Sequence, residues 1–351
     1  MKVLITGAAG FIGSHLAERL HAAGHTGRAL DCLTDYYALF QKQRNLRDLV
    51  QRRVEILPYD LAETKLAPAV ADCEVIFHLA AQPGISAHVP FEPYLRNNVI
   101  ATERLLDAAA KESSLKLFVN VSTSSVYGQY ATASEEAVPA PTSHYGVTKL
   151  AAEQLCLARQ RERGFPACSI RLFSVYGPRE RPEKLFPWLI RAIDGGTPFP
   201  LYEGSAEHRR SFTYVGDAVA GLAAAVDRTE KLPGEVINIG SDEEFSTGDG
   251  IALVEELMGH KVEIAHKPRR PGDQLLTKAT IDRARDLLDF QPTTSFRDGL
   301  KAEIDWLKEL IAAEQRAATT PLTKPQREVH PVAAPADYNP QHERADHNTA
   351  G

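Results

Sequence analysis

The feature that most constrains the fold is a glycine-rich turn near the N-terminus, with the sequence TGAAGFIG at residues 6–13. It follows a short apolar run at residues 2–5, typical of a buried parallel strand, and it precedes a helical pattern. Gly7 allows a sharp turn, Gly10 lets the backbone approach a pyrophosphate, and Gly13 lets the helix pack closely on the strand. Free N–H groups at the helix start would then face the anion. This order predicts an α/β fold with a doubly wound parallel, Rossmann-like sheet.

Length and composition narrow the class of protein. A chain of 351 residues can bury a substantial core, and its 40 basic and 46 acidic residues give a net charge of −6. This balance argues against nucleic acid or an anionic membrane as a partner. The four cysteines are widely spaced without a CxxC pair, so neither a disulfide framework nor a metal site is predicted. The N-terminal apolar run is too short for a signal peptide, and we expect a soluble, cytoplasmic protein.

An acidic residue follows the second predicted strand. Residues 26–30 form this strand, and Asp31 comes 18 residues after Gly13. A carboxylate at this spacing receives the hydroxyls of the adenosine ribose and repels a 2′-phosphate. No arginine follows immediately. The sequence therefore favours NAD over NADP as the cofactor.

The predicted strand at residues 74–79 ends in small residues. Ala80 and Ala81 would let a cofactor lie against the strand end, where open α/β sheets place their ligands. His78 lies inside this apolar run, and a histidine there is more often packed and hydrogen-bonded than catalytic. We therefore predict a structural role for His78.

A tyrosine and a lysine carry the predicted chemistry. A strand at residues 117–121 leads to the hydroxyl-rich run at residues 122–125, and Tyr145 and Lys149 follow on a predicted helix. Residues four apart share one helix face, so the ammonium can lie near the phenol. A free phenol has a pKa of about 10, and an adjacent cation lowers it toward neutral pH. The pair therefore predicts a tyrosine that acts as a general base.

These motifs together resemble the extended branch of the short-chain dehydrogenase/reductase superfamily. The spacing TGxxGxxG, the run GFIGSHL and the YxxxK dyad carry the resemblance, which covers about residues 1–310. The run DCLTDYYALFQKQRNL after the second strand is similar to one in UDP-glucuronate 4-epimerases. The resemblance implies an NAD-dependent 4-epimerase that converts UDP-glucuronate to UDP-galacturonate by transient oxidation at C4.

The resemblance also implies roles for individual residues. The catalytic group is Tyr145, Lys149, Thr123 and Ser124. The cofactor-binding group is Gly7, Gly10, Phe11, Ile12, Gly13, Asp31, Asp60, Leu61, Leu79, Ala80, Ala81, Tyr145 and Lys149. The substrate-binding group is Ser124, Ser174, Arg181, Tyr202, Arg210 and Arg270.

Arg181 is the residue on which the prediction of an acidic sugar depends. The loop GPRERPEKLF is similar to the GPRxRP loop of UDP-glucuronate 4-epimerases, whose second arginine faces the sugar carboxylate. A salt bridge from Arg181 to Glu180 or Glu183 is the alternative interpretation. Ser86 and Ser211 depart from the family pattern, which has an arginine and an aspartate at these positions.

The predicted organisation has three parts. Residues 1–173, with a returning segment at about 213–240, form the NAD-binding domain; residues 174–212 and 241–316 bind substrate; residues 317–351 form a disordered tail. Relatives of this type pair through helices matching residues 97–111 and 145–163, which implies a homodimer. The alternatives are a UDP-glucose 4-epimerase, another nucleotide-sugar-modifying enzyme such as a decarboxylase or dehydratase, and a non-catalytic NAD-sensing protein.

Overall fold

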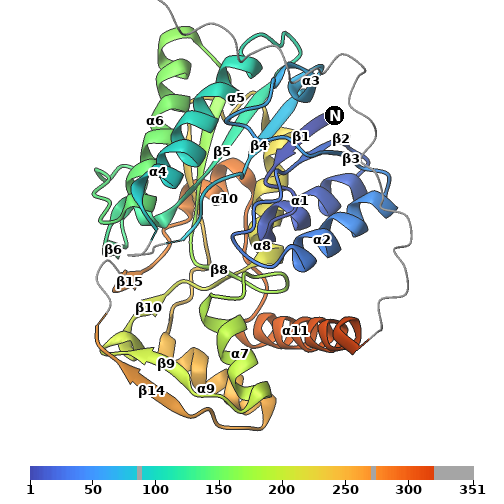
Figure 1. The fold of residues 1–351 in the computed structure, drawn as a ribbon. Coiled ribbons are helices and arrows are strands. Elements are labelled where there is room, and N and C mark those ends of the chain that lie inside the picture. Colours follow the sequence, from blue (N-terminus) through green and yellow to red (C-terminus); the bar gives the residue numbers. More distant parts are fainter. Residues whose placement is uncertain (85–88, 270–273, 320–351) are drawn as a thin grey trace, which may run out of the picture. The chain divides into compact units, whose positions relative to one another are not determined.

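A seven-stranded parallel sheet organises the computed structural model, which describes residues 1–84, 89–269 and 274–319 (Figure 1). The strand order is β12-β7-β5-β4-β1-β2-β3, and every neighbouring pair is parallel. The strands are β1 (Lys2–Thr6), β2 (Thr26–Leu30), β3 (Glu55–Leu57), β4 (Val75–His78), β5 (Leu117–Thr123), β7 (Ala167–Leu172) and β12 (Val236–Ile239). The order reverses beside β1, as in a doubly wound dinucleotide-binding sheet, so the predicted fold class is confirmed.

Helices cover both faces of this sheet (Figure 1). One layer contains α1 (Phe11–Ala22), α2 (Leu39–Gln51), α8 (Val215–Ala224) and α10 (Asp282–Leu288). The other contains α3 (Ala67–Val70), α4 (Phe91–Tyr94), the π-helical η1 (Leu95–Ile100), α5 (Ala101–Ala109) and α6 (His144–Arg163).

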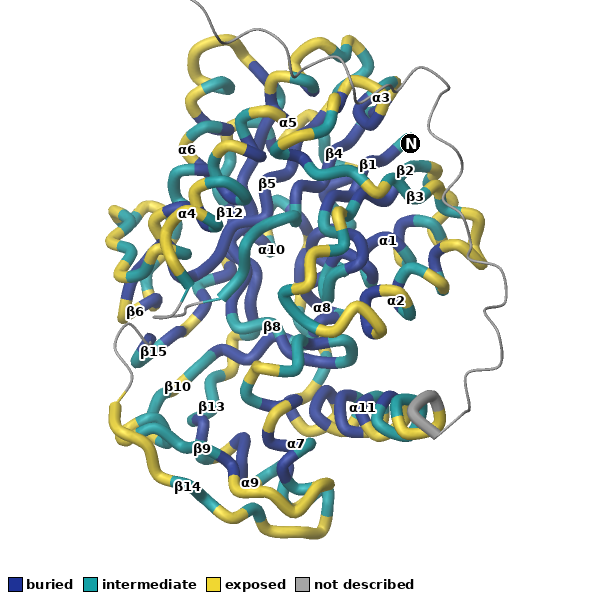
Figure 2. The backbone as a smooth tube through the Cα atoms, viewed as in Figure 1, coloured by how far each residue is buried: buried dark blue, intermediate teal, exposed yellow. Residues whose placement is uncertain are grey.

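A hydrophobic cluster lies on each face of the sheet, and alternate side chains of β1 pack into one or the other. Val3 and Ile5 pack in the cluster that contains Leu16 of α1, whereas Leu4 packs in the cluster that contains Leu105 of α5. This alternation follows from the two-residue period of a strand. Because both faces are covered, β1, β4 and β5 are buried along nearly their whole length (Figure 2). Apolar runs rather than alternating patterns therefore mark these strands in the sequence.

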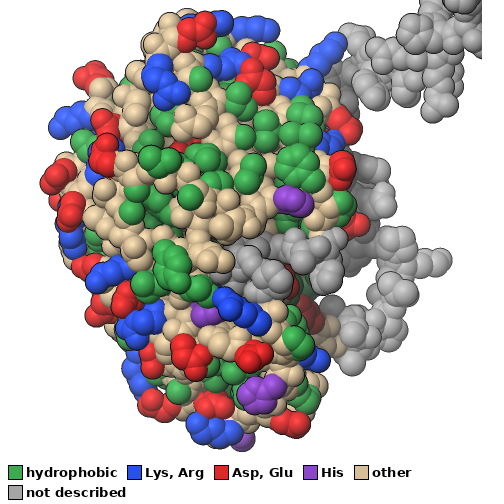
Figure 3. Space-filling model, turned by 90° about the vertical axis from the view of Figure 1, so that its left-hand side faces the viewer, with side chains coloured by type: hydrophobic (Ala, Val, Ile, Leu, Met, Phe, Trp, Pro, Cys, Tyr) green, Lys and Arg blue, Asp and Glu red, His purple; other side chains and the backbone are tan. Residues whose placement is uncertain are grey.

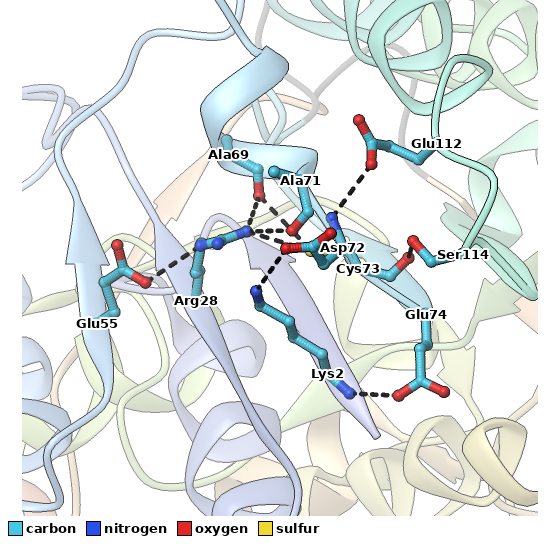
Figure 4. A network of polar contacts seen from close by, with 10 residues as sticks. All are labelled: Lys2, Arg28, Glu55, Ala69, Ala71, Asp72, Cys73, Glu74, Glu112 and Ser114. Atoms are coloured by element: carbon cyan, nitrogen blue, oxygen red, sulfur yellow. Dashed lines mark hydrogen bonds and ion pairs between the residues drawn. The ribbon is translucent and has the colours of Figure 1, made fainter.

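Polar contacts hold the edge of the sheet where the strands begin (Figure 4). Arg28 in β2 donates to the carbonyls of Ala69 and Ala71 at the end of α3, at 3.1 and 2.7 Å. The backbone N–H of Lys2 donates to the Glu74 carboxylate at 2.8 Å. These bonds satisfy backbone groups that a helix end and a strand start leave unpaired. This edge of the sheet is therefore stabilised structurally and lies opposite the strand ends that bear the predicted site.

Further elements lie outside the seven-stranded sheet and the helices that cover it. They are β6 (Tyr130–Ala131), β8 (Val175–Tyr176), α7 (Leu185–Gly195), β9 (Phe199–Tyr202), β10 (Arg209–Arg210), β11 (Thr213–Tyr214), β13 (Phe245–Ser246), α9 (Thr247–Met258), β14 (Ile264–Lys267), β15 (Leu276–Thr277) and α11 (Phe296–Thr319). The described residues also contain three short 3₁₀ turns: η2 (Ser124–Tyr127), η3 (Ser205–Glu207) and η4 (Ala225–Arg228). β13, β10, β15 and β6 form a four-stranded sheet, and α7 packs against α9.

Residues 1–308 form one compact unit, and a second begins at Glu309. The predicted division of residues 1–308 into an NAD-binding part and a substrate-binding part stays a prediction. Most of the predicted tail, from residue 320, lies outside the described residues, and α11 is helical to Thr319. Within the described part of the chain, no helix is long and apolar enough to cross a membrane.

Candidate functional site at the carboxyl ends of the strands

The predicted cofactor residues follow the ends of four neighbouring strands. The glycine turn follows β1, Asp31 follows β2, Asp60 follows β3, and residues 79–81 follow β4. Parallel strands present their carboxyl ends at one edge of a sheet, and the order of strands reverses at β1. The sheet topology therefore brings these residues to one edge at the switch point.

The glycine turn has no room for a side chain at Gly7 or at Gly13. Gly7 has a φ of +72°, and a Cβ on it would lie 2.8 Å from the backbone nitrogen of Ala80. A Cβ on Gly13 would lie 2.2 Å from the carbonyl oxygen of Gly7. Gly10 caps α1 without a side-chain hydrogen bond, so the N–H groups that begin the helix at Phe11 are directed outward without a capping partner. This is the backbone geometry that a pyrophosphate requires.

The two acidic residues at the strand ends already hold backbone groups. The Asp31 carboxylate accepts from the backbone N–H of Ala9 at 3.0 Å and from that of Leu33 at 2.8 Å. It therefore ties the end of β2 to the glycine turn. The Asp60 carboxylate accepts from the backbone N–H of Ala62 and pairs with Arg96, both at 2.8 Å. Leu61, which follows Asp60, is buried.

His78 is buried and hydrogen-bonded on both sides of its ring. Its Nδ1 lies 2.9 Å from the Thr6 hydroxyl, and its Nε2 lies 2.8 Å from the Thr102 hydroxyl. Thr102 donates to the carbonyl of Asn98, so it accepts from His78, which then carries its proton on Nε2. Burial, with the charge of Lys149 as a smaller cause, lowers the pKa of His78 to about 3. The neutral ring is a structural link, as predicted.

The same chain of bonds reaches the helix that carries the tyrosine and lysine. Asn98 donates to the Thr148 hydroxyl at 3.0 Å, and Thr148 donates to the carbonyls of His144 and Tyr145. Asn98 lies in the π-helical turn η1, a local widening that often occurs at functional sites. The end of β1 is thus connected through buried polar groups to the first turn of α6. This turn is capped by Ser143, which accepts from the N–H of Gly146 at 3.1 Å.

Tyr145 and Lys149 lie on α6 beside the end of β5. Burial raises the pKa of the Tyr145 phenol, whereas the charge of Arg181 and a hydrogen bond with Thr123 lower it. Burial also lowers the pKa of Lys149 to about 8. Thr123 ends β5, and Ser124 begins the buried turn after it. Arg181 is thus the charged side chain that lowers the pKa of this phenol, and the action of Lys149 on it stays a prediction.

Arg181 is held on a loop that both cofactor-side helices support. His15 of α1 donates to the carbonyl of Pro178 at 2.8 Å, and Gln41 of α2 donates to the carbonyl of Arg179 at 3.0 Å. The Arg181 guanidinium lies 5.5 Å from the centre of the Tyr36 ring. Because Arg181 also acts on the Tyr145 phenol, the loop brings this guanidinium into the region of the tyrosine.

The remaining predicted substrate residues lie on or after strands of three different sheets. Ser174 follows β7 with a φ of +35°. Tyr202 lines a surface pocket with Leu201, Ala206, His266 and Lys267, among others. Arg210 donates to the carbonyl of Gln274 at 3.0 Å. Arg270 and Ser86 lie outside the described residues.

Comparison with known proteins identifies the family. The model of the NAD dependent epimerase/dehydratase family matches residues 3–240. YtcB of Bacillus subtilis, named as an uncharacterized UDP-glucose epimerase, is 38% identical over 90% of this chain and all of its own length. The UDP-glucuronic acid 4-epimerase of Bacillus cereus, solved with UDP-glucuronic acid and NAD, is 37% identical with a TM-score of 0.85, covering 88% of this chain and all of that one. A UDP-N-acetyl-α-D-glucosaminuronate decarboxylase of Bacillus cytotoxicus is 31% identical over 88% of this chain and 98% of its own.

The chain belongs to the NAD dependent epimerase/dehydratase family. It is a nucleotide-sugar epimerase of the extended short-chain dehydrogenase/reductase type, and its cofactor is NAD. The glycine turn fits this cofactor, because Gly7 and Gly13 let the turn pack directly on the backbone after β4 and on the start of α1, where the first N–H groups of the helix can face a pyrophosphate. The turn, Asp31 and the small residues after β4 would hold NAD, which supplies a hydride acceptor when bound.

Two residues of this epimerase escaped prediction because their neighbours lie far away in the sequence. Gln274 donates to the carbonyls of Ser124 and Gly128, at 3.2 and 3.0 Å, and so connects Arg210 to the end of β5. Tyr36 forms the aromatic face beneath Arg181. Only the run of two tyrosines after the second strand could have suggested it.

Two further features have structural explanations. Glu153, one helical turn after Lys149, forms a buried, two-pronged ion pair with Arg171 of β7, with atoms at 2.5 and 3.0 Å. The charged Arg171 within the largely buried strand β7 is the sequence feature that could have indicated a buried partner of opposite charge. Ser211, which departs from the family pattern, is fully buried and accepts from the backbone N–H of Ala279 at 2.9 Å. A hydroxyl at this position joins β10 to the segment after β15.

Proposed function

We propose that this epimerase acts on UDP-glucuronate and inverts C4 to give UDP-galacturonate. The observation that carries the proposal is the position of Arg181, a forked cation acting on the Tyr145 phenol. A guanidinium there matches a carboxylate at C6 of a sugar whose C4 hydroxyl faces the tyrosine. The Bacillus cereus relative, a UDP-glucuronic acid 4-epimerase, supports the assignment.

The chain's own groups account for the proton transfers. Tyr145 as phenolate would take the proton from the C4 hydroxyl while bound NAD accepts the hydride. Thr123, hydrogen-bonded to the phenol, would orient the oxygen, together with Ser124. Burial opposes the phenolate, and the charge of Arg181 favours it. Lys149, one helical turn further along α6, would add a second positive charge on the same face of the helix. Tyr145 would return the proton after the keto sugar has turned.

Arg181 has a second task in this mechanism. Oxidation at C4 turns a uronate into a β-keto acid, which readily loses carbon dioxide. A guanidinium that holds the carboxylate ionised and in one orientation opposes the spread of charge that this loss requires. The turn after β5 carries two hydroxyls, Ser124 and Ser125, and no acidic group that could assist the loss of water from the sugar. Both features favour epimerisation.

A UDP-glucose 4-epimerase is the second candidate. The name of YtcB and the structure of the relative MoeE5 with UDP-glucose and NAD favour it. MoeE5 was also solved with UDP-glucuronic acid. Steady-state kinetics with both sugars tests the proposal: kcat/KM should be higher for UDP-glucuronate, and a higher value for UDP-glucose would overturn it.

We also propose that the enzyme is a homodimer. Leu95 and Ile100 of η1 are 38% and 46% exposed, and Val147 of α6 is 46% exposed. Figure 3 looks at the side of residues 1–308 where α4 and α6 lie, and hydrophobic side chains gather there. An apolar face of this kind on two helices suits a symmetric pairing with a second copy.

A further inference from the structure

Arg181 is engaged by a carboxylate of its own loop. Its Nη1 lies 2.8 Å from Oε1 of Glu183, two residues further along the chain. The Arg181 side chain is 14% exposed, and that of Glu183 is 42% exposed. Although the two atoms are close, Nη1 makes no hydrogen bond of good geometry. The guanidinium therefore has a charged partner in Glu183, but its Nη1 remains without a well-aligned acceptor.

The rest of the loop cannot easily move to change this arrangement. His15 and Gln41 hold the carbonyls of Pro178 and Arg179, and Arg179 pairs with Glu18 of α1 at 2.8 Å. These contacts come from α1 and α2, which cover one face of the seven-stranded sheet. Arg181 can therefore change its partner by side-chain rotation alone, without movement of the backbone. The half-exposed Glu183 side chain can turn into solvent.

We propose that Glu183 is an internal competitor for the sugar carboxylate and thereby a specificity-determining residue. Its carboxylate is the same chemical group as C6 of a uronate, so both need the same guanidinium. This inference rests on the proposed function, because only an acidic sugar needs Arg181. Binding of a uronate requires Glu183 to release Arg181, whereas binding of a neutral hexose leaves the ion pair in place. Glu183 therefore weakens the binding of uronates and leaves that of hexoses unchanged.

One substitution distinguishes a Glu183 that competes with the substrate from a Glu183 that positions Arg181, by the direction in which it changes KM for UDP-glucuronate. Glu183→Gln removes the charge and keeps the size of the side chain. If Glu183 competes, KM for UDP-glucuronate should fall by about two- to fivefold, the effect expected for a partly exposed ion pair, and KM for UDP-glucose should stay unchanged. If Glu183 instead positions Arg181, KM for UDP-glucuronate should rise, and that result or no change would overturn the proposal.

Two further variants complete the test. Glu162→Gln, at a glutamate that is 65% exposed and paired with Arg163, controls for the loss of one negative charge. It should leave both KM values unchanged. In the Arg181→Ala background, Glu183→Gln should lose its effect. If Arg181→Ala leaves KM for UDP-glucuronate unchanged, the proposed substrate and this inference both fail. If it raises KM but Glu183→Gln does not lower it, this inference alone fails.

Discussion

At the scale of single residues, the proposed chemistry depends on Tyr145. Tyr145→Phe removes the only atom of this side chain that can carry a proton and keeps its packing beside Thr123. We expect turnover to fall by about 10²- to 10⁴-fold, the usual contribution of a general base, with binding of the nucleotide sugar retained.

Steady-state kinetics and a binding titration would check this expectation. Tyr130→Phe is a matched control, because Tyr130 is 61% exposed and should tolerate the change. Near-normal turnover in Tyr145→Phe would assign the base to another group.

The second residue-scale prediction concerns Arg181. Arg181→Ala should raise KM for UDP-glucuronate by about 10- to 100-fold, since a charge-assisted hydrogen bond contributes about 1.5–3 kcal/mol. The variant should also release UDP-pentose, because the keto intermediate would no longer be held against loss of carbon dioxide. Chromatography of the products measures the leak.

Arg181→Lys keeps the positive charge but loses the two parallel donors of the guanidinium. Its KM for UDP-glucuronate and its release of pentose should therefore lie between those of the wild type and of Arg181→Ala. An alanine variant with unchanged KM and no pentose would show that Arg181 serves the loop alone.

At the scale of elements, the buried glutamates Glu180 and Glu303 join the Arg181 loop to α11. Burial raises the pKa of Glu180 to about 7, and burial together with the charge of Glu180 raises that of Glu303. The folded protein therefore keeps protons that the unfolded chain releases above about pH 4.5. Stability from this pair is fully present below that pH and is lost as the pH rises through about 7.

Glu303→Gln should remove part of this pH dependence. The amide carries no charge, so the free energy of unfolding should fall less between pH 5 and pH 8 than in the wild type, where each proton costs about 1.4 kcal/mol per pH unit. Urea unfolding at the two pH values measures the difference. Glu162→Gln is the exposed control. The same pH dependence in Glu303→Gln as in the wild type would contradict the prediction.

Elements with local signals could be predicted from sequence, whereas contacts between distant segments could not. The glycine turn, β1 and β2 agree with their predicted positions, because apolar runs bounded by turn residues mark the strands. Helix α2 was missed, since its buried residues include the polar Gln41, Lys42 and Asn45. The ion pair of Arg181 with Glu183 is local and was predicted as an alternative. The Tyr36 ring beside Arg181 and the Gln274 carbonyl bound by Arg210 come from segments far apart in the chain, so no periodicity indicates them.

At the scale of the whole molecule, the proposed homodimer can be tested at its apolar face. Ile100→Arg places a charge on a side chain that is 46% exposed in one copy, so the fold of residues 1–308 should tolerate it. We expect light scattering to find the wild type at about twice the chain mass of 38.6 kDa and the variant at the chain mass. Val50→Arg, at a 54% exposed position on α2 in the opposite helix layer, should stay dimeric. A wild type found only at 38.6 kDa would rule out the dimer.

The account as a whole states that one carbon of a uronate is oxidised and reduced again within a single site. The most direct test is to incubate the enzyme and NAD with UDP-glucuronate carrying deuterium at C4 and to follow the product by NMR. We predict UDP-galacturonate that retains the deuterium at C4, at a rate faster than UDP-glucose is converted. Deuterium lost to solvent, a pentose as the main product, or faster conversion of UDP-glucose would contradict the account.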